Sequence, residues 1–141
     1  MQNYCRSMIF LVAIPLLLSG CSDLRKLTYP RDFTYIDKTD LHNGMFALSA
    51  SLAKLDALVS ANGPVGKDKQ KAVIDELNRL DRIANRIRGK GEHTNHLVID
   101  EHMDQFLGDI DNAKLFAENR PPNYYYAGKL AGSCTACHEY R

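Results

Sequence analysis

Neither an excess of one charge nor a long apolar run is present in this chain. It carries 18 basic and 17 acidic side chains among 141 residues. Its most apolar stretch, residues 8–18, holds about ten apolar residues and is interrupted by Pro15, whereas a membrane-spanning helix needs about 20. Proteins that bind nucleic acid are usually clearly basic. The composition therefore argues against a permanent membrane-spanning helix in this stretch and against nucleic acid as a partner.

Two other patterns are missing. No segment alternates polar and apolar residues with a period of two, which is the signature of a half-buried β-strand. No Ser-His-Asp set and no pair of carboxylates suited to acid-base catalysis stands out along the chain. The sequence therefore predicts an all-α protein, and nothing in it indicates an enzyme.

The first 20 residues resemble an export signal. One basic residue, Arg6, precedes the short apolar run, and small residues follow that run. The segment Leu18-Ser19-Gly20-Cys21 is similar to the bacterial lipobox, whose cysteine is acylated and becomes the first residue after cleavage. We therefore expect residues 1–20 to be a signal peptide that is removed and Cys21 to carry a lipid anchor. An ordinary secretory leader that is cut nearby is the alternative.

Such a leader would place the mature chain on the periplasmic side of the cell envelope. More than one acyl chain makes a stable anchor, because each buried CH₂ contributes about 0.8 kcal/mol. Ser22 stands where an aspartate would favour retention in the inner membrane, so the outer membrane is expected. Removal of residues 1–20 takes away Arg6 and no acidic residue, which leaves 17 basic against 17 acidic side chains.

The expected mature chain divides into an arm and a domain. Residues 21–38 contain Pro30 and show no clear period, so they predict a lipidated tether or an arm that lies on the domain surface. Fully extended, residues 22–38 would reach about 55 Å. Residues 39–141 predict one compact domain, because a mature chain of this length suits a single core.

Four apolar stripes with helical spacing run through this domain. Stop signals follow the first three, at Asn62-Gly63-Pro64, Gly89-Lys90-Gly91 and Pro121-Pro122. Thr94 and Asn123 are expected to cap the third and fourth helices. Short breaks between helices of about 20 residues predict an antiparallel up-down-up-down four-helix bundle. The stripes are, in chain order, Leu41, Met45, Leu48, Leu52, Leu55 and Val59; Val73, Leu77, Leu80, Ala84 and Ile87; Ile99, Met103, Phe106, Ile110, Ala113 and Ala117; and Tyr126, Leu130, Cys134 and Cys137.

Residues 134–138 read Cys-Thr-Ala-Cys-His, close to the end of the last stripe. This is the attachment signature of a c-type haem, in which two thiols a helical turn apart form thioethers to the haem vinyl groups and the adjacent histidine ligates the iron. A disulfide, a redox dithiol and half of a zinc site are the alternatives. Zinc would need a second cluster, and the other two cysteines belong to the leader. We expect one haem c on Cys134 and Cys137, with His138 as an axial iron ligand.

The start of the first helix and the end of the fourth meet at one pole of such a bundle. Met45 lies about one and a half turns into the first helix, on its core-facing stripe. Its thioether would face the His138 imidazole across the iron, and a core methionine that only fills space is the alternative. The other residues considered for the sixth iron position, all mapped to this pole, are His42, His93, His96, His102 and Met103.

Three arginines, Arg82, Arg86 and Arg88, crowd the end of the second helix, where positive charge favours the helix dipole. A solvated basic face is the expected role. Pairing of one of them with a haem propionate is the alternative.

With these residues in place, the domain resembles the single-domain four-helix cytochromes, both the cytochrome c prime type and the related soluble periplasmic b-type cytochrome. Residues 40–45, Asp-Leu-His-Asn-Gly-Met, are similar to the methionine-bearing helix start of the b-type protein, and residues 138–141 are similar to its histidine-bearing end. Cys134 and Cys137 resemble the attachment site of the c prime side instead. The resemblance covers residues 39–141. It implies iron ligation by His138 and, as in low-spin members, by the methionine at Met45.

Ligation by His138 and Met45 would give a low-spin haem of relatively high potential, which moves single electrons. The sequence thus predicts a membrane-anchored one-electron carrier between periplasmic or membrane redox proteins. One rival is a c prime-like protein that binds nitric oxide or carbon monoxide at an open iron site lined by Leu41, Met45 and Phe46. Another is a structural lipoprotein whose haem only stabilises the bundle. A homodimer, frequent among the c prime relatives, is compatible with the sequence.

Overall fold

The computed structural model describes residues 29–30, 32–62 and 66–139. The expected signal peptide, Cys21 and the first part of the tether, up to residue 28, lie outside the described residues. Four helices account for most of the described chain, and two short strands precede α3 and α5. In chain order the elements are β1 (Phe33–Thr34), α3 (Lys38–Ser60), α4 (Lys67–Arg88), β2 (His93–Thr94), α5 (Leu97–Ala117) and α6 (Tyr125–Glu139).

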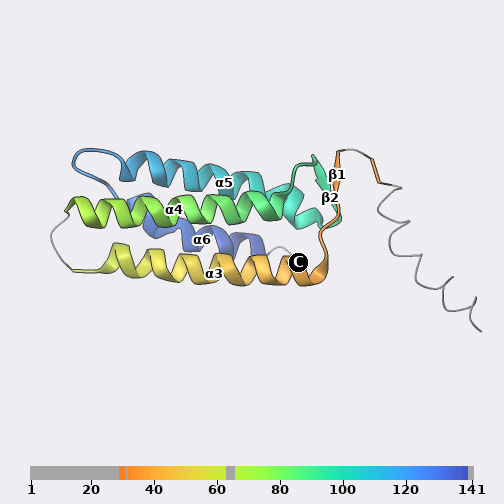
Figure 1. Cartoon of the computed structure of the whole chain (residues 1–141), viewed down its shortest axis with the longest axis horizontal. Coiled ribbons are helices and arrows are strands. Elements are labelled where there is room, and N and C mark those ends of the chain that lie inside the picture. Colours follow the sequence, from red (N-terminus) through yellow and green to blue (C-terminus); the bar gives the residue numbers. More distant parts are fainter. Residues whose placement is uncertain (1–28, 31, 63–65, 140–141) are drawn as a thin grey trace, which may run out of the picture.

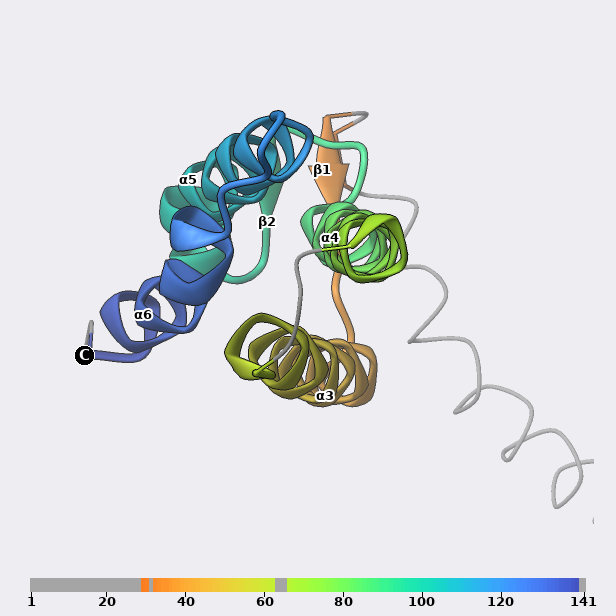
Figure 2. The same cartoon turned by 90° about the vertical axis from the view of Figure 1, so that its left-hand side faces the viewer.

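The four helices pack side by side, and each runs opposite to the one before it (Figure 1). Seen nearly end-on, α4 lies against α3 and near α5, while α6 completes the set beside α5 (Figure 2). Of these neighbouring pairs, α3 and α6 have the least contact. The prediction of an all-helical domain with four packed helices is confirmed. The structure adds a small parallel pair, in which Phe33 lies opposite His93 and Thr34 opposite Thr94.

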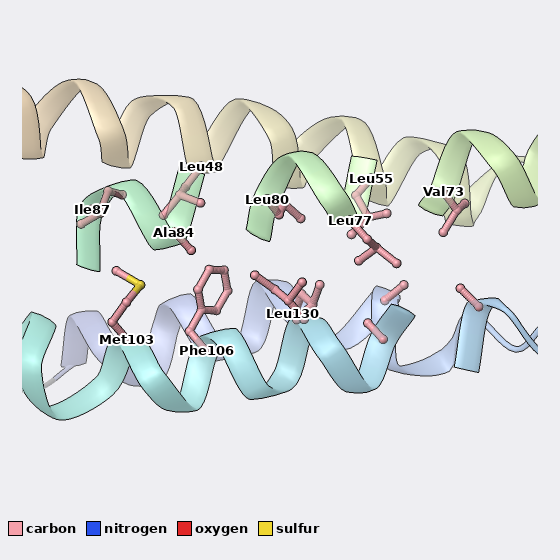
Figure 3. Close-up of a cluster of buried hydrophobic side chains, with 14 of the residues drawn as sticks. Leu48, Leu55, Val73, Leu77, Leu80, Ala84, Ile87, Met103, Phe106 and Leu130 are labelled. Atoms are coloured by element: carbon pink, nitrogen blue, oxygen red, sulfur yellow. The ribbon is translucent and has the colours of Figure 1, made fainter. Parts of the chain in front are cut away.

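The predicted stripes of α4 and α5 are confirmed, since every member is buried in the core (Figure 3). In α3 the centre of the core is formed by Leu48 and Leu55, and the other members of its stripe are half-buried. The stripe of α6 differs by one residue from the prediction. Its buried members are Ala127 and Leu130, whereas Tyr126 is 38% exposed.

Tyr126 lies off the core because the spacing of α6 begins one residue later. Ala127, Leu130 and Cys134 follow one another at steps of three and four, which keeps them on one helix face. The Tyr126 ring instead packs against Phe116 of α5, with ring centroids 4.4 Å apart. The core therefore contains the small Ala127, where the spacing had predicted the larger Tyr126.

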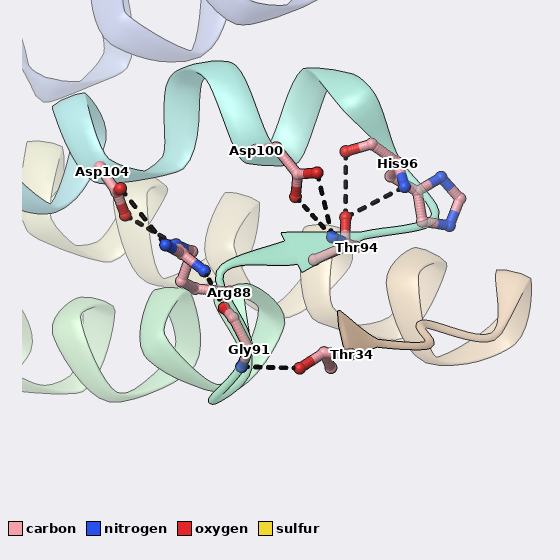
Figure 4. A network of polar contacts seen from close by, with 7 residues as sticks. All are labelled: Thr34, Arg88, Gly91, Thr94, His96, Asp100 and Asp104. Atoms are coloured by element: carbon pink, nitrogen blue, oxygen red, sulfur yellow. Dashed lines mark hydrogen bonds and ion pairs between the residues drawn. The ribbon is translucent and has the colours of Figure 1, made fainter. Parts of the chain in front are cut away.

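The helix caps agree with the prediction at one position and differ at another. Asn123 Oδ1 accepts the backbone N–H of Tyr125, the first residue of α6, at 2.9 Å, so this side chain satisfies one donor at the start of that helix. Thr94 does not cap α5, because the cap residue is His96. The Thr94 hydroxyl exchanges hydrogen bonds with the backbone of His96, while the Thr94 N–H donates to the Asp100 carboxylate (Figure 4).

One charged side chain, Glu76 of α4, is buried, with 3% of its side chain exposed. Ser51 of α3 donates a hydrogen bond to it, and Lys54 Nζ of α3 lies 2.6 Å from its other oxygen. Burial by itself would raise the pKa of Glu76, but the contacts with Lys54 and Ser51 and the charge of Arg79 together lower it. The carboxylate therefore remains charged and links α3 to α4.

We expect Glu76→Gln to lower the free energy of unfolding by about 1.5–3 kcal/mol at pH 7, because it removes a charge-assisted hydrogen bond inside the protein. Since the pKa of Glu76 is lowered, its contribution is present above the ordinary value of 4.5 and is lost as the pH falls through the lowered pKa. Denaturant titrations at several pH values measure this difference.

The matched control is Asp75→Asn at the neighbouring position, where an exposed carboxylate pairs with Lys71. Exposed pairs contribute less than about 1 kcal/mol. Equal losses in the two variants, or a loss for Glu76→Gln that does not shrink in acid, would contradict the role given to Glu76.

Two glycines should respond oppositely to alanine. A Cβ at Gly91 would overlap the carbonyl oxygen of Asp32 and lie 2.9 Å from the Thr34 nitrogen, and both are backbone atoms of the arm. A Cβ at Gly108, inside α5, would meet nothing within 4 Å. Gly91→Ala is expected to destabilise the protein by about 1–3 kcal/mol, and Gly108→Ala to stabilise it by about 0.5–1 kcal/mol.

The free energy of unfolding of both variants measures this contrast. The rate of trypsin cleavage after Lys38 reports on the arm separately, and it is expected to rise in Gly91→Ala alone. If Gly91→Ala changes neither the free energy of unfolding nor the cleavage rate, the close approach of the arm to Gly91 does not stabilise the protein.

Candidate cofactor site

The start of α3 and the end of α6 lie at the same end of the bundle (Figure 1), and a pocket lined by residues of both helices opens toward this end. The space inside it, counted together with its open mouth, is about 570 Å³. It lies between α3, α5 and α6, and α4 contributes none of its lining residues. The lining residues are Met45, Leu48, Val98, Ile99, His102, Met103, Gln105, Phe106, Asp109, Ser133, Cys134, Ala136, Cys137 and His138.

Both cysteines of the Cys-Thr-Ala-Cys-His segment line this pocket. They are one turn apart on α6 and therefore share a helix face, and each is half-buried. Burial raises the pKa of both thiols, and the neighbouring Cys137 raises that of Cys134 further. The thiols are thus held in the protonated form beside an apolar cavity.

This environment differs from that of a redox dithiol. Such dithiols have a lowered pKa and commonly lie at a helix N-terminus, whereas Cys134 and Cys137 occupy the last turns of α6. There the negative end of the helix dipole disfavours a thiolate. Geometry and pKa together weigh against thiol-disulfide exchange and are compatible with thiols that are bonded to a cofactor.

His138 and Met45 lie on different walls of the same pocket. His138 is exposed in the last turn of α6, and Met45 is half-buried near the start of α3. The two residues are 93 positions apart in the sequence, and only the packing of the first helix near the last brings them together. The structure therefore gathers the four predicted haem-site residues of the domain, the two cysteines included, at one pocket.

The other residues considered as iron ligands separate into two groups. His42, His93 and His96 do not line the pocket; the first two are exposed, and His96 Nε2 lies 3.3 Å from the Ile36 carbonyl oxygen. His102 and Met103 of α5 do line it. Met103 is 5% exposed and points into the core beside Phe106 (Figure 3).

The apolar wall differs from the expected set Leu41, Met45 and Phe46. Phe46 is 73% exposed and Leu41 packs on the core, and neither lines the pocket. Leu48 and Phe106 replace them. The reason is the helical spacing of α3. Met45 and Leu48 lie on the same face of this helix, whereas Phe46 is rotated by about 100° from Met45 around the helix axis.

None of the three arginines at the end of α4 lines the pocket. Arg82 and Arg86 are exposed. Arg88 is 19% exposed, pairs with Asp104 at 2.7 Å and donates to the Gly91 carbonyl (Figure 4). Arg88 therefore ties α4 to α5, and no propionate contact is assigned to it.

A polar strip on α5 was not foreseen. Gln105 and Asp109 line the pocket beside the apolar wall, and Ser133 Oγ of α6 donates to Asp109 Oδ2 at 2.7 Å. Gln105 and Asp109 follow His102 at steps of three and four residues, so helical periodicity predicts that these polar residues lie beside the apolar stripe of α5. The Ser133–Asp109 bond joins α5 to α6 at the residue that precedes Cys134.

The donor set of the pocket fits a haem. Two thiols at the required spacing, the imidazoles of His102 and His138 and the thioethers of Met45 and Met103 line an otherwise largely apolar pocket. Within residues 29–30, 32–62 and 66–139, no group of three or more His, Cys, Asp or Glu side chains is placed to hold a metal ion. A haem requires no such group, because the porphyrin supplies four of the iron ligands and the protein supplies one or two.

The chain matches no protein-family model, and neither a curated protein nor a solved structure is significantly similar to it. None of the helices described is long and apolar enough to cross a membrane. The Cys-Thr-Ala-Cys-His motif and the geometry of the pocket are therefore the two observations that identify the site.

We expect the two thiols of the haem-free folded chain to react slowly with iodoacetamide near pH 7, because burial raises their pKa and lowers the thiolate fraction. Alkylation, followed by mass spectrometry, should be several-fold slower than in the same chain unfolded by urea. As a control, Thr135→Cys in a chain with Cys134→Ser and Cys137→Ser places one exposed thiol on the same helix, and it should react nearly as fast as in urea. Fast alkylation of the native pair would instead favour a redox dithiol.

Proposed function

We propose that this protein is a c-type cytochrome, anchored by acylated Cys21 on the periplasmic side of the cell envelope, most simply at the outer membrane. Cys134 and Cys137 would form the two thioethers to one haem, and His138 would be an axial iron ligand. The observation that supports this most is the pocket, because both thiols of the motif line it together with His138 and Met45.

Met45 is the proposed sixth ligand. It lines the pocket from α3, on a different wall from His138 on α6, and a macrocycle bound to α6 would have α3 across from it. A thioether opposite an imidazole favours the ferrous state and gives a low-spin haem of relatively high potential. Such an iron has no open position for a substrate, so the proposed function is one-electron transfer between periplasmic or membrane redox proteins.

The four-helix cytochromes that the sequence resembles support the same proposal. Four packed helices and a histidine in the last turn of the last helix agree with what that resemblance implies. The Cys-x-x-Cys pair agrees with the c prime side of the group, and the position of Met45 agrees with the b-type side.

A second candidate is a five-coordinate protein that binds nitric oxide or carbon monoxide. The apolar wall formed by Leu48, Met103 and Phe106 favours it, because an open iron site in such surroundings suits small neutral gases. The two candidates differ in whether the Met45 sulfur reaches the iron.

The absorption spectrum of the holoprotein tests this difference. We expect a low-spin ferric spectrum with the weak long-wavelength sulfur-to-iron band, and no response of the ferrous protein to carbon monoxide. Met45→Leu should abolish the band, convert the haem to high spin and permit carbon monoxide binding. A high-spin wild type that binds carbon monoxide would favour the gas-binding candidate.

The matched control is Met103→Leu, a change of similar volume in the same pocket. It should keep the low-spin spectrum, as should His102→Ala. Loss of the band in Met103→Leu, with the band kept in Met45→Leu, would identify Met103 as the sixth ligand. Separately, a denaturing gel stained for haem should show covalent haem in the wild type and none in Cys134→Ser with Cys137→Ser, and a wild type without covalent haem would contradict the cytochrome proposal.

A further inference from the structure

The arm before α3 contacts the bundle through Thr34 and Ile36. Thr34 Oγ1 accepts the backbone N–H of Gly91 at 2.9 Å (Figure 4). Ile36 is 7% exposed, and its backbone N–H and carbonyl both bond to the Asn95 side chain, at 2.7 and 2.9 Å. Ile36 belongs to the buried core, and the Thr34 side chain lies close to Gly89 and Gly91, so both side chains face the bundle.

The opposite face of the arm is aromatic. Phe33 and Tyr35 alternate with the inward residues, and both stack on Tyr29, with ring centroids 4.3 and 5.8 Å from it. Tyr35 is 43% exposed. None of the three rings belongs to the hydrophobic core, although Ile36 does. We call Tyr29, Phe33 and Tyr35 the aromatic face.

The aromatic face lies close in sequence to the expected lipid anchor. Tyr29 follows Cys21 by eight positions in the sequence, and these eight steps span at most about 28 Å when fully extended. The whole stretch from residue 22 to residue 38 would have allowed about 55 Å. Attachment of the arm to the bundle thus halves the distance at which the membrane can hold the domain.

The arm also joins the bundle at the end where the pocket opens. β1 pairs with β2, and β2 directly precedes α5, whose first turn contributes Val98 and Ile99 to the pocket. In Figure 1 the two strands and the end of α6 lie at the same end of the molecule. A membrane in contact with the arm would therefore be near the pocket.

We propose that the aromatic face rests in the lipid headgroup layer of the membrane that holds acylated Cys21, so that the pocket end of the bundle is turned toward that membrane. Tyrosine and phenylalanine suit this layer because their rings prefer its apolar side and the tyrosine hydroxyl remains hydrated. Arg25 and Lys26, which lie between Cys21 and Tyr29, would add attraction to anionic headgroups. This inference depends on the anchor in the proposed function.

The test uses the full acylated protein in vesicles of phosphatidylethanolamine and phosphatidylglycerol that contain a lipid with a photoactivatable diazirine headgroup. After irradiation, trypsin releases residues 32–38, which carry Phe33 and Tyr35, and residues 115–129, which carry the exposed Leu115 and Tyr125 of the opposite end. Tyr125 is 58% exposed, more than Tyr35. We expect several-fold more lipid adduct on residues 32–38 than on residues 115–129.

Two double variants complete the test. Phe33→Ser with Tyr35→Ser should reduce the adduct on residues 32–38 to the level of residues 115–129, whereas Leu115→Ser with Tyr125→Ser should leave it unchanged. Circular dichroism checks that both variants fold, and Tyr35→Ser alone, at an exposed position, replaces the first variant if it does not. Equal labelling of the two segments, or an adduct that survives the loss of both rings, overturns the proposal.

The readout does not involve the haem, so it tests the membrane contact of the aromatic face separately from the proposed cytochrome function. An acylated chain with labelling on the wrong segment overturns the aromatic-face proposal and leaves the cytochrome untouched. A chain that carries no acyl group in the membrane fraction overturns the anchor and this proposal together. The haem spectrum is measured independently of both.

Discussion

The burial of one apolar stripe from each of four helices is the constraint on which the rest of the molecule depends. The stripes of α4 and α5 are buried throughout, and the short connections make successive helices run in opposite directions. As a consequence the start of α3 and the end of α6 lie at one end of the bundle. Met45 and His138, 93 residues apart, reach the same pocket only because this core closes. The pocket opens along α3 and α6, the neighbouring pair with the least contact.

The polar groups of the bundle are placed so that the pocket stays largely apolar. Glu76, the buried carboxylate, bonds with Ser51 and Lys54 in the seam between α3 and α4, away from the pocket. Arg88 of α4 pairs with Asp104 of α5 and donates a hydrogen bond to the carbonyl of Gly91. Gly91 in turn bonds to Thr34 of the arm. The pocket keeps one polar strip, closed by the Ser133–Asp109 bond. Burial in the pocket raises the pKa of both thiols, which disfavours thiolate chemistry there.

Local sequence rules failed where a neighbour in space decided the outcome. Thr94 has the side chain of a helix cap, but the strand pair with the arm places it two residues before the cap of α5. Tyr126 lies at a plausible core spacing, but the Phe116 ring lies beside it and the small Ala127 fits the core. The polar strip of α5 follows from helical periodicity and could have been predicted. The pairing of the arm with β2 could not, because a two-residue strand has too few residues to show alternation.

By itself the sequence determined the helices, the buried faces of α4 and α5 and the thiol-imidazole motif, since these depend on spacing within one helix. It also indicated the end of the bundle at which the motif lies. Only the tertiary structure decided which residues share the pocket, because that depends on how far neighbouring helices separate. Phe46 was excluded from it and Phe106 included by the rotation of each helix about its axis. The attachment of the arm to Gly91 and Asn95 was likewise a tertiary outcome, since its hydrogen bonds join a backbone N–H to a side-chain oxygen nearly 60 residues away, and no local pattern relates such positions.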